Sequence, residues 1–91
     1  MGIVSGVIVF LDNSILDLME LVNGGGGDYR FQYMNKNKEL IRRWDNAPHY
    51  RSMKSFPYHL HTKNGVEDSK KMNLIEVLDI VLEKVIQGLN L

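Results

Sequence analysis

The 91-residue sequence contains no cysteine, and that absence excludes several classes of protein. Disulfide-stapled scaffolds, cysteine-ligated zinc sites and thiol nucleophiles are ruled out. The sequence also lacks an apolar run of the ~20 residues that a membrane-spanning helix needs. The apolar run at 3–11 has no basic residue before it, so we do not expect a secretory signal peptide. The expectation is one small cytoplasmic domain without a membrane span, occupying residues 1–91.

The 11 basic and 11 acidic side chains balance overall, but they are unevenly distributed along the chain. The segment 29–65 holds eight basic and two acidic residues, whereas the remainder holds three basic and nine acidic residues. The same segment contains all three histidines and seven of the eight aromatic residues. Such a segment is compatible with binding RNA or another phosphate ligand. The alternative is that the basic side chains coat the solvent face of a sheet.

The first part of the chain is expected to form strands. A run over 3–11, rich in Val and Ile, has the length of a strand that is buried on both faces. The short connection 12–14 links it to a second run, 15–22, and predicts a β-hairpin, although that run also fits two helical turns. The four consecutive glycines at 24–27 favour a flexible hairpin loop over a phosphate-binding loop, because the P-loop pattern is missing.

The middle of the chain shows the clearest alternation. Aromatic residues at 29, 31 and 33 alternate with polar ones and predict a strand over 28–35 with one aromatic face. Turn residues separate it from a strand over 39–45. A further extended stretch over 55–61 contains Pro57, which confines it to a sheet edge or an irregular arm.

The C-terminal part is expected to be helical. Residues 66–72 form a charged connector, and Asn73 followed by Glu76 has the spacing of a capping box. Apolar residues then recur with helical spacing over 74–87, and they are more numerous than one buried stripe requires. The predicted fold is therefore α+β, with an antiparallel sheet of about five strands packed by one long C-terminal helix.

Two histidines carry the first chemical signal. On an extended segment, His59 and His61 place both imidazoles on the same face. Together with His49 or Asp45 they could ligate a divalent metal ion, or they could serve as an acid and a base, since an unperturbed histidine titrates near ~6.5. Metal-independent RNA cleavage needs such a pair next to an arginine. The alternative for each histidine is a structural hydrogen bond in a loop.

The strand expected at 39–45 carries the second signal. Arg43 and Asp45 share one face, where they could form a phosphate clamp or only a surface ion pair. Arg42 and Trp44 share the other face, and Trp44 fits the core better than it fits a platform for base stacking. The candidate catalytic residues are His59, His61, His49, Arg43, Asp45 and Tyr58. The candidate substrate contacts are Arg42, Trp44, Tyr50 and Lys54.

Two blocks of the sequence, RRWDNAPHY at 42–50 and FPYHLH at 56–61, resemble the signature of the TumE family of toxin–antitoxin toxins. The hairpin around 12–14 and the helix after an acidic connector also fit that family, so the resemblance spans nearly the whole chain. Tyr50 and Tyr58 stand where the family often has histidine. The resemblance implies a small cytoplasmic growth-inhibiting toxin that is neutralised by an antitoxin, commonly one with a helix-turn-helix DNA-binding domain.

Two functions remain open from the sequence. In the first, the protein is a ribonuclease, with Arg43 or Arg42 holding the phosphate, His59 and His61 as the acid and base, and Tyr58 as an auxiliary donor. His49 and Asp45 would position them. In the second, the protein is a non-enzymatic interaction module whose histidines hold the loop 46–62 on the sheet, and it binds an antitoxin or forms a homodimer. No cofactor is required by the first function, although a divalent metal on His49, His59 and His61 is a variant of either.

Overall fold

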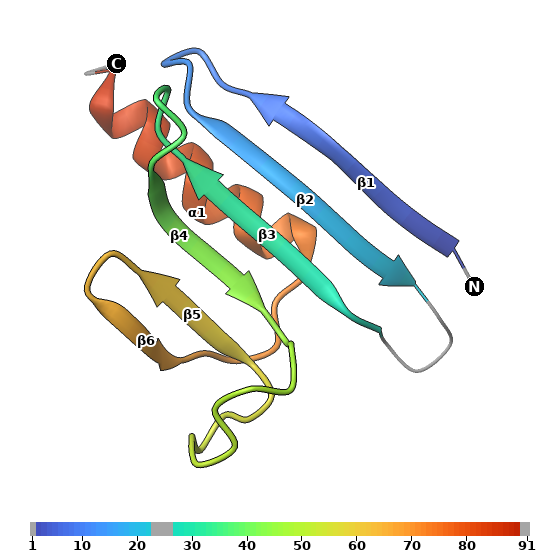
Figure 1. Ribbon diagram of the computed structural model, residues 1–91. Helices are drawn as coiled ribbons and strands as arrows, with labels where there is room; N and C mark the ends of the chain where they lie inside the picture. Colours follow the sequence, from blue (N-terminus) through green and yellow to red (C-terminus); the bar gives the residue numbers. More distant parts are fainter. Residues whose placement is uncertain (1, 23–26, 90–91) are drawn as a thin grey trace.

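The computed structural model describes residues 2–22 and 27–89, which form a six-stranded antiparallel sheet and one helix (Figure 1). The strands follow one another across the sheet in sequence order. They are β1 (Gly2–Val9), β2 (Ile15–Val22), β3 (Tyr29–Met34), β4 (Leu40–Asp45), β5 (His59–Thr62) and β6 (Gly65–Asp68), followed by α1 (Leu74–Gly88). The α+β class and the C-terminal helix are confirmed, and the sheet has one strand more than the expected five.

The additional strand is β6, in the segment that was expected to be a charged connector. It returns against β5 through a tight turn, with Thr62 opposite Gly65 in the pairing. Gly65 takes a φ of 133°, a backbone conformation that favours glycine. Because β6 is short, charged and at the sheet edge, its sequence carries little of the apolar alternation by which strands are recognised.

The helix covers one face of the sheet, and the core lies between the two layers. Tyr29, Phe31 and Tyr33 point to this face from β3, as their alternation predicts, and β2 and β4 add apolar side chains beside them. The helix contributes three buried valines one turn apart, at 77, 81 and 85. The predicted capping box is confirmed, since Asn73 and Glu76 each bond to the other's backbone amide. The aromatic face is therefore core.

The first strand differs from the expectation. β1 is an edge strand, and Ile3, Val7 and Val9 remain 71%, 61% and 63% exposed, so the prediction of a strand buried on both faces is wrong. Apolar composition alone does not distinguish a central strand from an edge strand. The second run, 15–22, is the strand β2 and not a helix. The loop predicted at 24–27 falls largely on residues 23–26, outside the described part of the chain.

The segment before β5 also differs. The strand begins at His59 and not at residue 55, and turns and a bend occupy residues 51–57 before it. The peptide bond before Pro57 is cis. This segment matters for function because it brings the ring of Tyr50 against the rings of His59 and His61.

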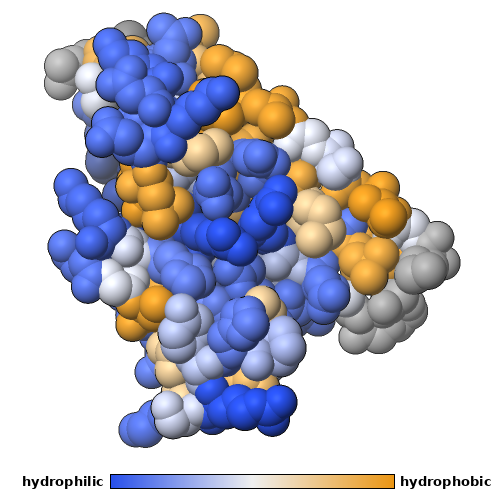
Figure 2. Space-filling view, in the orientation of Figure 1, coloured by the Kyte–Doolittle hydropathy of each residue, from blue (hydrophilic) through white to orange (hydrophobic). Residues whose placement is uncertain are grey.

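The sheet face opposite the helix is divided into two areas. Figure 2 shows a hydrophobic band along the β1 side and a hydrophilic area over the middle of the sheet. Strand pairing explains the division, because side chains at paired positions point to the same face. Ile3 and Val7 of β1 project here, whereas Arg30 of β3 and Arg43 and Asp45 of β4 project from the middle.

Candidate functional site

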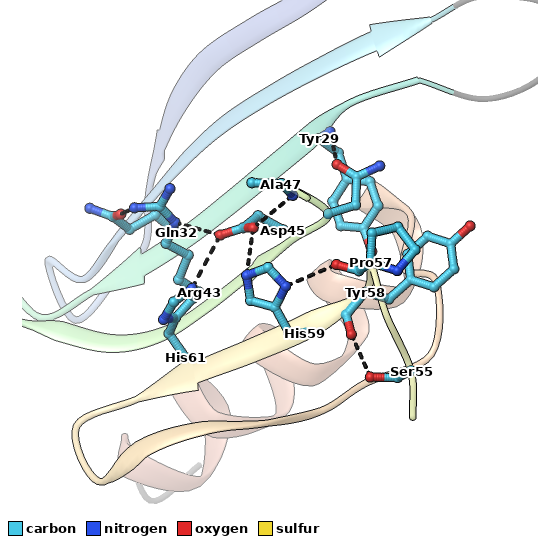
Figure 3. A network of polar contacts seen from close by, with 11 residues as sticks. Tyr29, Gln32, Arg43, Asp45, Ala47, Ser55, Pro57, Tyr58, His59 and His61 are labelled. Carbon is cyan, nitrogen blue, oxygen red and sulfur yellow. Dashed lines mark hydrogen bonds and ion pairs between the residues drawn. The ribbon is translucent and has the colours of Figure 1, made fainter. Parts of the chain in front are cut away.

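The hydrophilic area is centred on the pairing of β4 with β5. Asp45 lies opposite His59, and Arg43 lies opposite His61. Because these positions alternate with Trp44 and Leu60, which face the helix, all four polar side chains meet on the opposite face. Figure 3 shows them converging on the carboxylate of Asp45. The cluster is therefore formed by two strand segments, RRWD and HLH, whose polar residues alternate with residues that face the helix and are paired across β4 and β5.

Asp45 is the centre of the cluster, and only 3% of its surface is exposed. Its Oδ2 accepts a hydrogen bond from Nε of Arg43 at 2.9 Å, and its Oδ1 accepts one from the backbone amide of Ala47 at 3.1 Å. Burying a carboxylate is costly unless it is paired and hydrogen-bonded, and these donors meet that requirement. Arg43 reaches further to Oε1 of Gln32 at 3.4 Å.

His59 is buried beside this carboxylate, with 2% exposure. Its Nδ1 lies 2.9 Å from the carbonyl oxygen of Pro57, and a carbonyl only accepts, so Nδ1 carries a hydrogen and donates it. Its Nε2 lies 2.7 Å from Oδ1 of Asp45 without the alignment of a hydrogen bond. Nε2 of His59 therefore has no hydrogen-bond partner among the described residues.

His61 is the accessible imidazole of the cluster. Its side chain is 25% exposed, and its Nε2 lies 3.4 Å from Oδ2 of Asp45. Burial lowers the pKa of His61 from its ordinary 6.5, and nearby Asp45 only partly opposes that effect. His61 is therefore predominantly neutral at pH 7, which is the form that can accept a proton.

Tyr50 lies over both histidines. Its ring centroid is 5.1 Å from that of His59 and 5.9 Å from that of His61, in edge-to-face geometry. Tyr50 has a φ of 55°, in the left-handed region that few bulky residues adopt. Such strain costs of order ~1 kcal/mol and is concentrated at functional sites. The segment 46–58 therefore holds an aromatic ring against the cluster at an energetic cost.

The other residues singled out in the sequence lie apart from this cluster. Tyr58 stacks on Tyr29 at 6.5 Å and turns away from His61 (Figure 3). Trp44 is buried in the core, and Arg42, one position from Arg43, lies on the helix side of the strand. Exposed positions of the segment 46–58 hold the remaining two, His49 and Lys54. The ring of His49 reaches Tyr50 at 6.3 Å but is not part of the cluster.

Three supporting groups were missed by the sequence reasoning. Two are backbone groups, the amide of Ala47 and the carbonyl of Pro57, and the residue type at a position does not predict such contacts. The third is Gln32, whose place on the polar face of β3 follows from the alternation, although its partner does not. A fourth residue near the site, Arg30, was counted only as part of the basic segment.

The cluster also has the donor set of a transition-metal site. Asp45, His59 and His61 each offer one ligand atom, and these atoms lie within 4.8 Å of one another. The hydrogen bond from Nδ1 of His59 to a backbone carbonyl is the orienting contact that metal-binding histidines usually make. Arg43 works against a metal ion, because its positive charge already pairs with Oδ2 of Asp45. Of the candidate ligands from the sequence, the structure brings Asp45 together with His59 and His61, and His49 is not part of this group.

The fold and the cluster describe a small α+β domain that carries a histidine–carboxylate–arginine site on the open face of its sheet. The family model described as Toxin TumE matches residues 1–89, so the chain belongs to the TumE family. It is a toxin of a toxin–antitoxin system, and a cognate antitoxin is its partner. Searches of curated proteins and of solved structures returned no match. None of the helices in the described residues has the length and apolarity to cross a membrane.

Proposed function

We propose that the toxin is a metal-independent ribonuclease that cleaves RNA by attack of the 2′-hydroxyl on the adjacent phosphate. The observation that carries this proposal is that one buried carboxylate, Asp45, holds both an accessible imidazole, His61, and a half-exposed guanidinium, Arg43. A base and a positive charge fixed about one shared anchor are two of the three groups that this reaction uses, and water takes the place of the acid because His59 is buried. RNA is found in the cytoplasm, where we therefore place the toxin.

The reaction assigns one task to each group. Neutral His61 removes the proton from the 2′-hydroxyl, the 2′-oxygen forms a bond to phosphorus, and the bond from phosphorus to the 5′-oxygen breaks. The leaving 5′-oxygen takes a proton from water. Arg43 stabilises the negative charge that develops on the phosphate oxygens. Asp45 orients His61 and stabilises its protonated form, in the way that a buried aspartate supports a catalytic histidine elsewhere.

His59 and Tyr50 have supporting tasks. His59 is too buried to touch a substrate, so it is a positioning residue that packs against the carboxylate of Asp45 inside the protein. Tyr50 is 44% exposed beside His61 and offers a ring on which a base of the substrate stacks. Lys54, exposed on the same segment, is a secondary contact for the RNA backbone.

The test is the purified toxin incubated with total RNA, with and without EDTA, followed by analysis of the new chain ends. The proposal expects cleavage that resists EDTA and leaves 2′,3′-cyclic phosphate and 5′-hydroxyl ends. Cleavage that is lost with EDTA and restored by zinc would transfer Asp45, His59 and His61 to a metal site. A folded, toxic protein that leaves RNA intact would contradict the ribonuclease.

A second candidate function, protein binding through β1, is favoured by one observation. β1 is an eight-residue edge strand without a charged residue or proline, and the side chains of Ile3, Val7 and Val9 are largely exposed. Edge strands normally carry charged residues or proline, which prevent pairing with another chain. A second copy fits this edge best, because antiparallel pairing of two uncharged β1 strands brings no like charges together.

Light scattering after size exclusion tests that function with a matched pair of variants. Val7→Lys places a charge on β1, and Ile75→Lys places the same charge on the helix, at a position that is similarly exposed (61% and 71%). Self-pairing expects a dimeric wild type, a monomeric Val7→Lys and a dimeric Ile75→Lys. A monomeric wild type would exclude the homodimer, and the same variants would then test binding of the antitoxin. The helix-turn-helix type of that antitoxin rests on the family resemblance.

A further inference from the structure

A cavity of about 270 Å³ opens beside the cluster, between the β2–β4 part of the sheet and the start of the segment 46–58. Met19 and Pro48 contribute apolar walls, and Arg30 and Arg43 contribute two guanidinium groups. Asp45 also lines this cavity, so the cavity adjoins the proposed catalytic groups directly. Its volume is at the small end of ligand pockets and suits one nucleotide unit more than a large ligand.

Arg30 is a cationic residue of the cavity with unused bonding capacity, and the lining also includes the acidic residues Asp28 and Asp45. Its Nε is buried and has no hydrogen-bond partner. One terminal nitrogen lies 3.3 Å from Oδ1 of Asp17, in a pair whose side chains are 39% and 40% exposed, which is a weak surface contact. By comparison, both polar atoms of the Asn46 amide have a partner, since its oxygen accepts from the backbone of Tyr29 and its nitrogen donates to the carbonyl of Gly27.

Strand register places the two arginines as neighbours. Arg30 pairs with Asp45, and Gln32 pairs with Arg43, so Arg30 and Arg43 occupy diagonal positions on adjacent strands. Diagonal neighbours on one face of a sheet are roughly 7–8 Å apart, which is within reach of two long side chains that bind one chain of phosphates. A buried N–H group without a partner requires an acceptor, and an anionic oxygen is the strongest acceptor for a guanidinium.

We propose that this cavity is a second phosphate subsite, in which Arg30 binds the phosphodiester next to the scissile one in single-stranded RNA. The inference rests on the proposed ribonuclease, because it assigns the scissile phosphate to Arg43. Arg30 is a substrate-binding residue in this scheme and takes no part in proton transfer. It contributes to the affinity for RNA and to the choice of the bond that is cleaved.

The experiment compares three charge-changing variants with the wild type. Arg30→Gln removes the guanidinium, and Lys36→Gln makes the same change of charge at an exposed position of the β3–β4 turn. Asp17→Asn breaks the surface pair but leaves Arg30 in place. The probes are fluorescein-labelled 2′-O-methyl pentanucleotides, one for each base, which lack the attacking hydroxyl. Their binding is followed by anisotropy across a series of salt concentrations, and cleavage of an unmodified RNA is measured in parallel.

The proposal expects Arg30→Gln to weaken pentanucleotide binding about tenfold and to reduce the salt slope by about 0.7, the value for one phosphate contact on a single strand. Lys36→Gln should bind like the wild type, and Asp17→Asn should bind at least as tightly, because it removes a negative charge beside Arg30. For cleavage, Arg30→Gln should raise KM and leave kcat within about threefold. Asp17→Asn distinguishes phosphate binding by Arg30 from a merely structural ion pair with Asp17. If Arg30 acted only through that ion pair, Asp17→Asn and Arg30→Gln would behave alike.

The outcomes separate this subsite from the ribonuclease itself. Unchanged binding and unchanged KM in Arg30→Gln, with a wild type that cleaves RNA, would overturn the subsite alone. A wild type that binds the pentanucleotides through Arg30 but cleaves nothing would overturn the ribonuclease and keep Arg30 only as a phosphate contact for single-stranded RNA. A wild type that binds none of the four pentanucleotides would overturn the subsite as well.

Discussion

Replacing Asp45 with asparagine should destabilise the protein strongly, because this carboxylate holds the site together. The carboxylate accepts from Arg43 and from the backbone amide of Ala47, and it lies 2.7 Å from His59. An asparagine has only one acceptor oxygen, so its NH₂ group must face one of these donors. Losing a charge-assisted hydrogen bond costs about 1.5–3 kcal/mol, and breaking a buried ion pair costs about 3–5 kcal/mol.

We expect Asp45→Asn to lower the free energy of unfolding by about 3 kcal/mol, toward the low end of the buried-pair range, because Arg43 is 38% exposed and regains solvation. For a domain of this size that loss lowers Tm by about 12–24 °C. The assay is urea unfolding followed by the fluorescence of Trp44, which is the only tryptophan and is 3% exposed.

The matched control is Asp17→Asn, which removes a carboxylate from an exposed pair with Arg30. Exposed pairs contribute less than about 1 kcal/mol, so this variant should unfold close to the wild-type midpoint. If Asp45→Asn and Asp17→Asn had equal free energies of unfolding, the reasoning from burial would be refuted.

Four further predictions concern His61, the helix cap and the core. Because burial lowers the pKa of His61, the acidic limb of the cleavage-rate profile should lie below pH 6.5, and a limb above that pH would contradict its role as base. The same lowered pKa affects stability, because the unfolded chain protonates His61 at a higher pH than the folded protein does. The free energy of unfolding should therefore fall as the pH drops through 6.5. This pH-dependent fall should be absent in His61→Asn. Asn73→Ala should cost about 1 kcal/mol in urea unfolding through loss of the helix cap, and an unchanged midpoint would mean that the cap is not formed in solution. Phe31→Ala should cost about 3–5 kcal/mol, because this side chain is fully buried, and a loss under 1 kcal/mol would place it outside the core.

Local alternation in the sequence predicted the parts of the fold that depend on neighbouring residues. The aromatic face of β3 and the two faces of β4 follow from a period of two, and the helix start follows from Asn73 and Glu76. The exposure of β1 depends on its place at the sheet edge, which local composition does not encode. β6 was missed for a related reason, since a short charged edge strand resembles a connector.

The candidate site was predicted in its residue types but not in its membership. Alternation placed His59 with His61 and Arg43 with Asp45, and the β4–β5 register, which sequence spacing does not fix, joined the two pairs. The place of Tyr50 depends on how the segment 46–58 folds, so the sequence did not predict its contact with the histidines.

The measurement that tests the central claim most directly compares two single histidine variants for RNA cleavage in EDTA and for growth inhibition. His61→Ala removes the proposed base, whereas His49→Ala removes an exposed histidine outside the cluster. The account predicts that His61→Ala, folded as judged by Trp44 fluorescence, loses cleavage and toxicity about 100-fold or more, and that His49→Ala stays within a few-fold of the wild type. A His61→Ala variant that cleaves RNA and inhibits growth like the wild type would contradict the account.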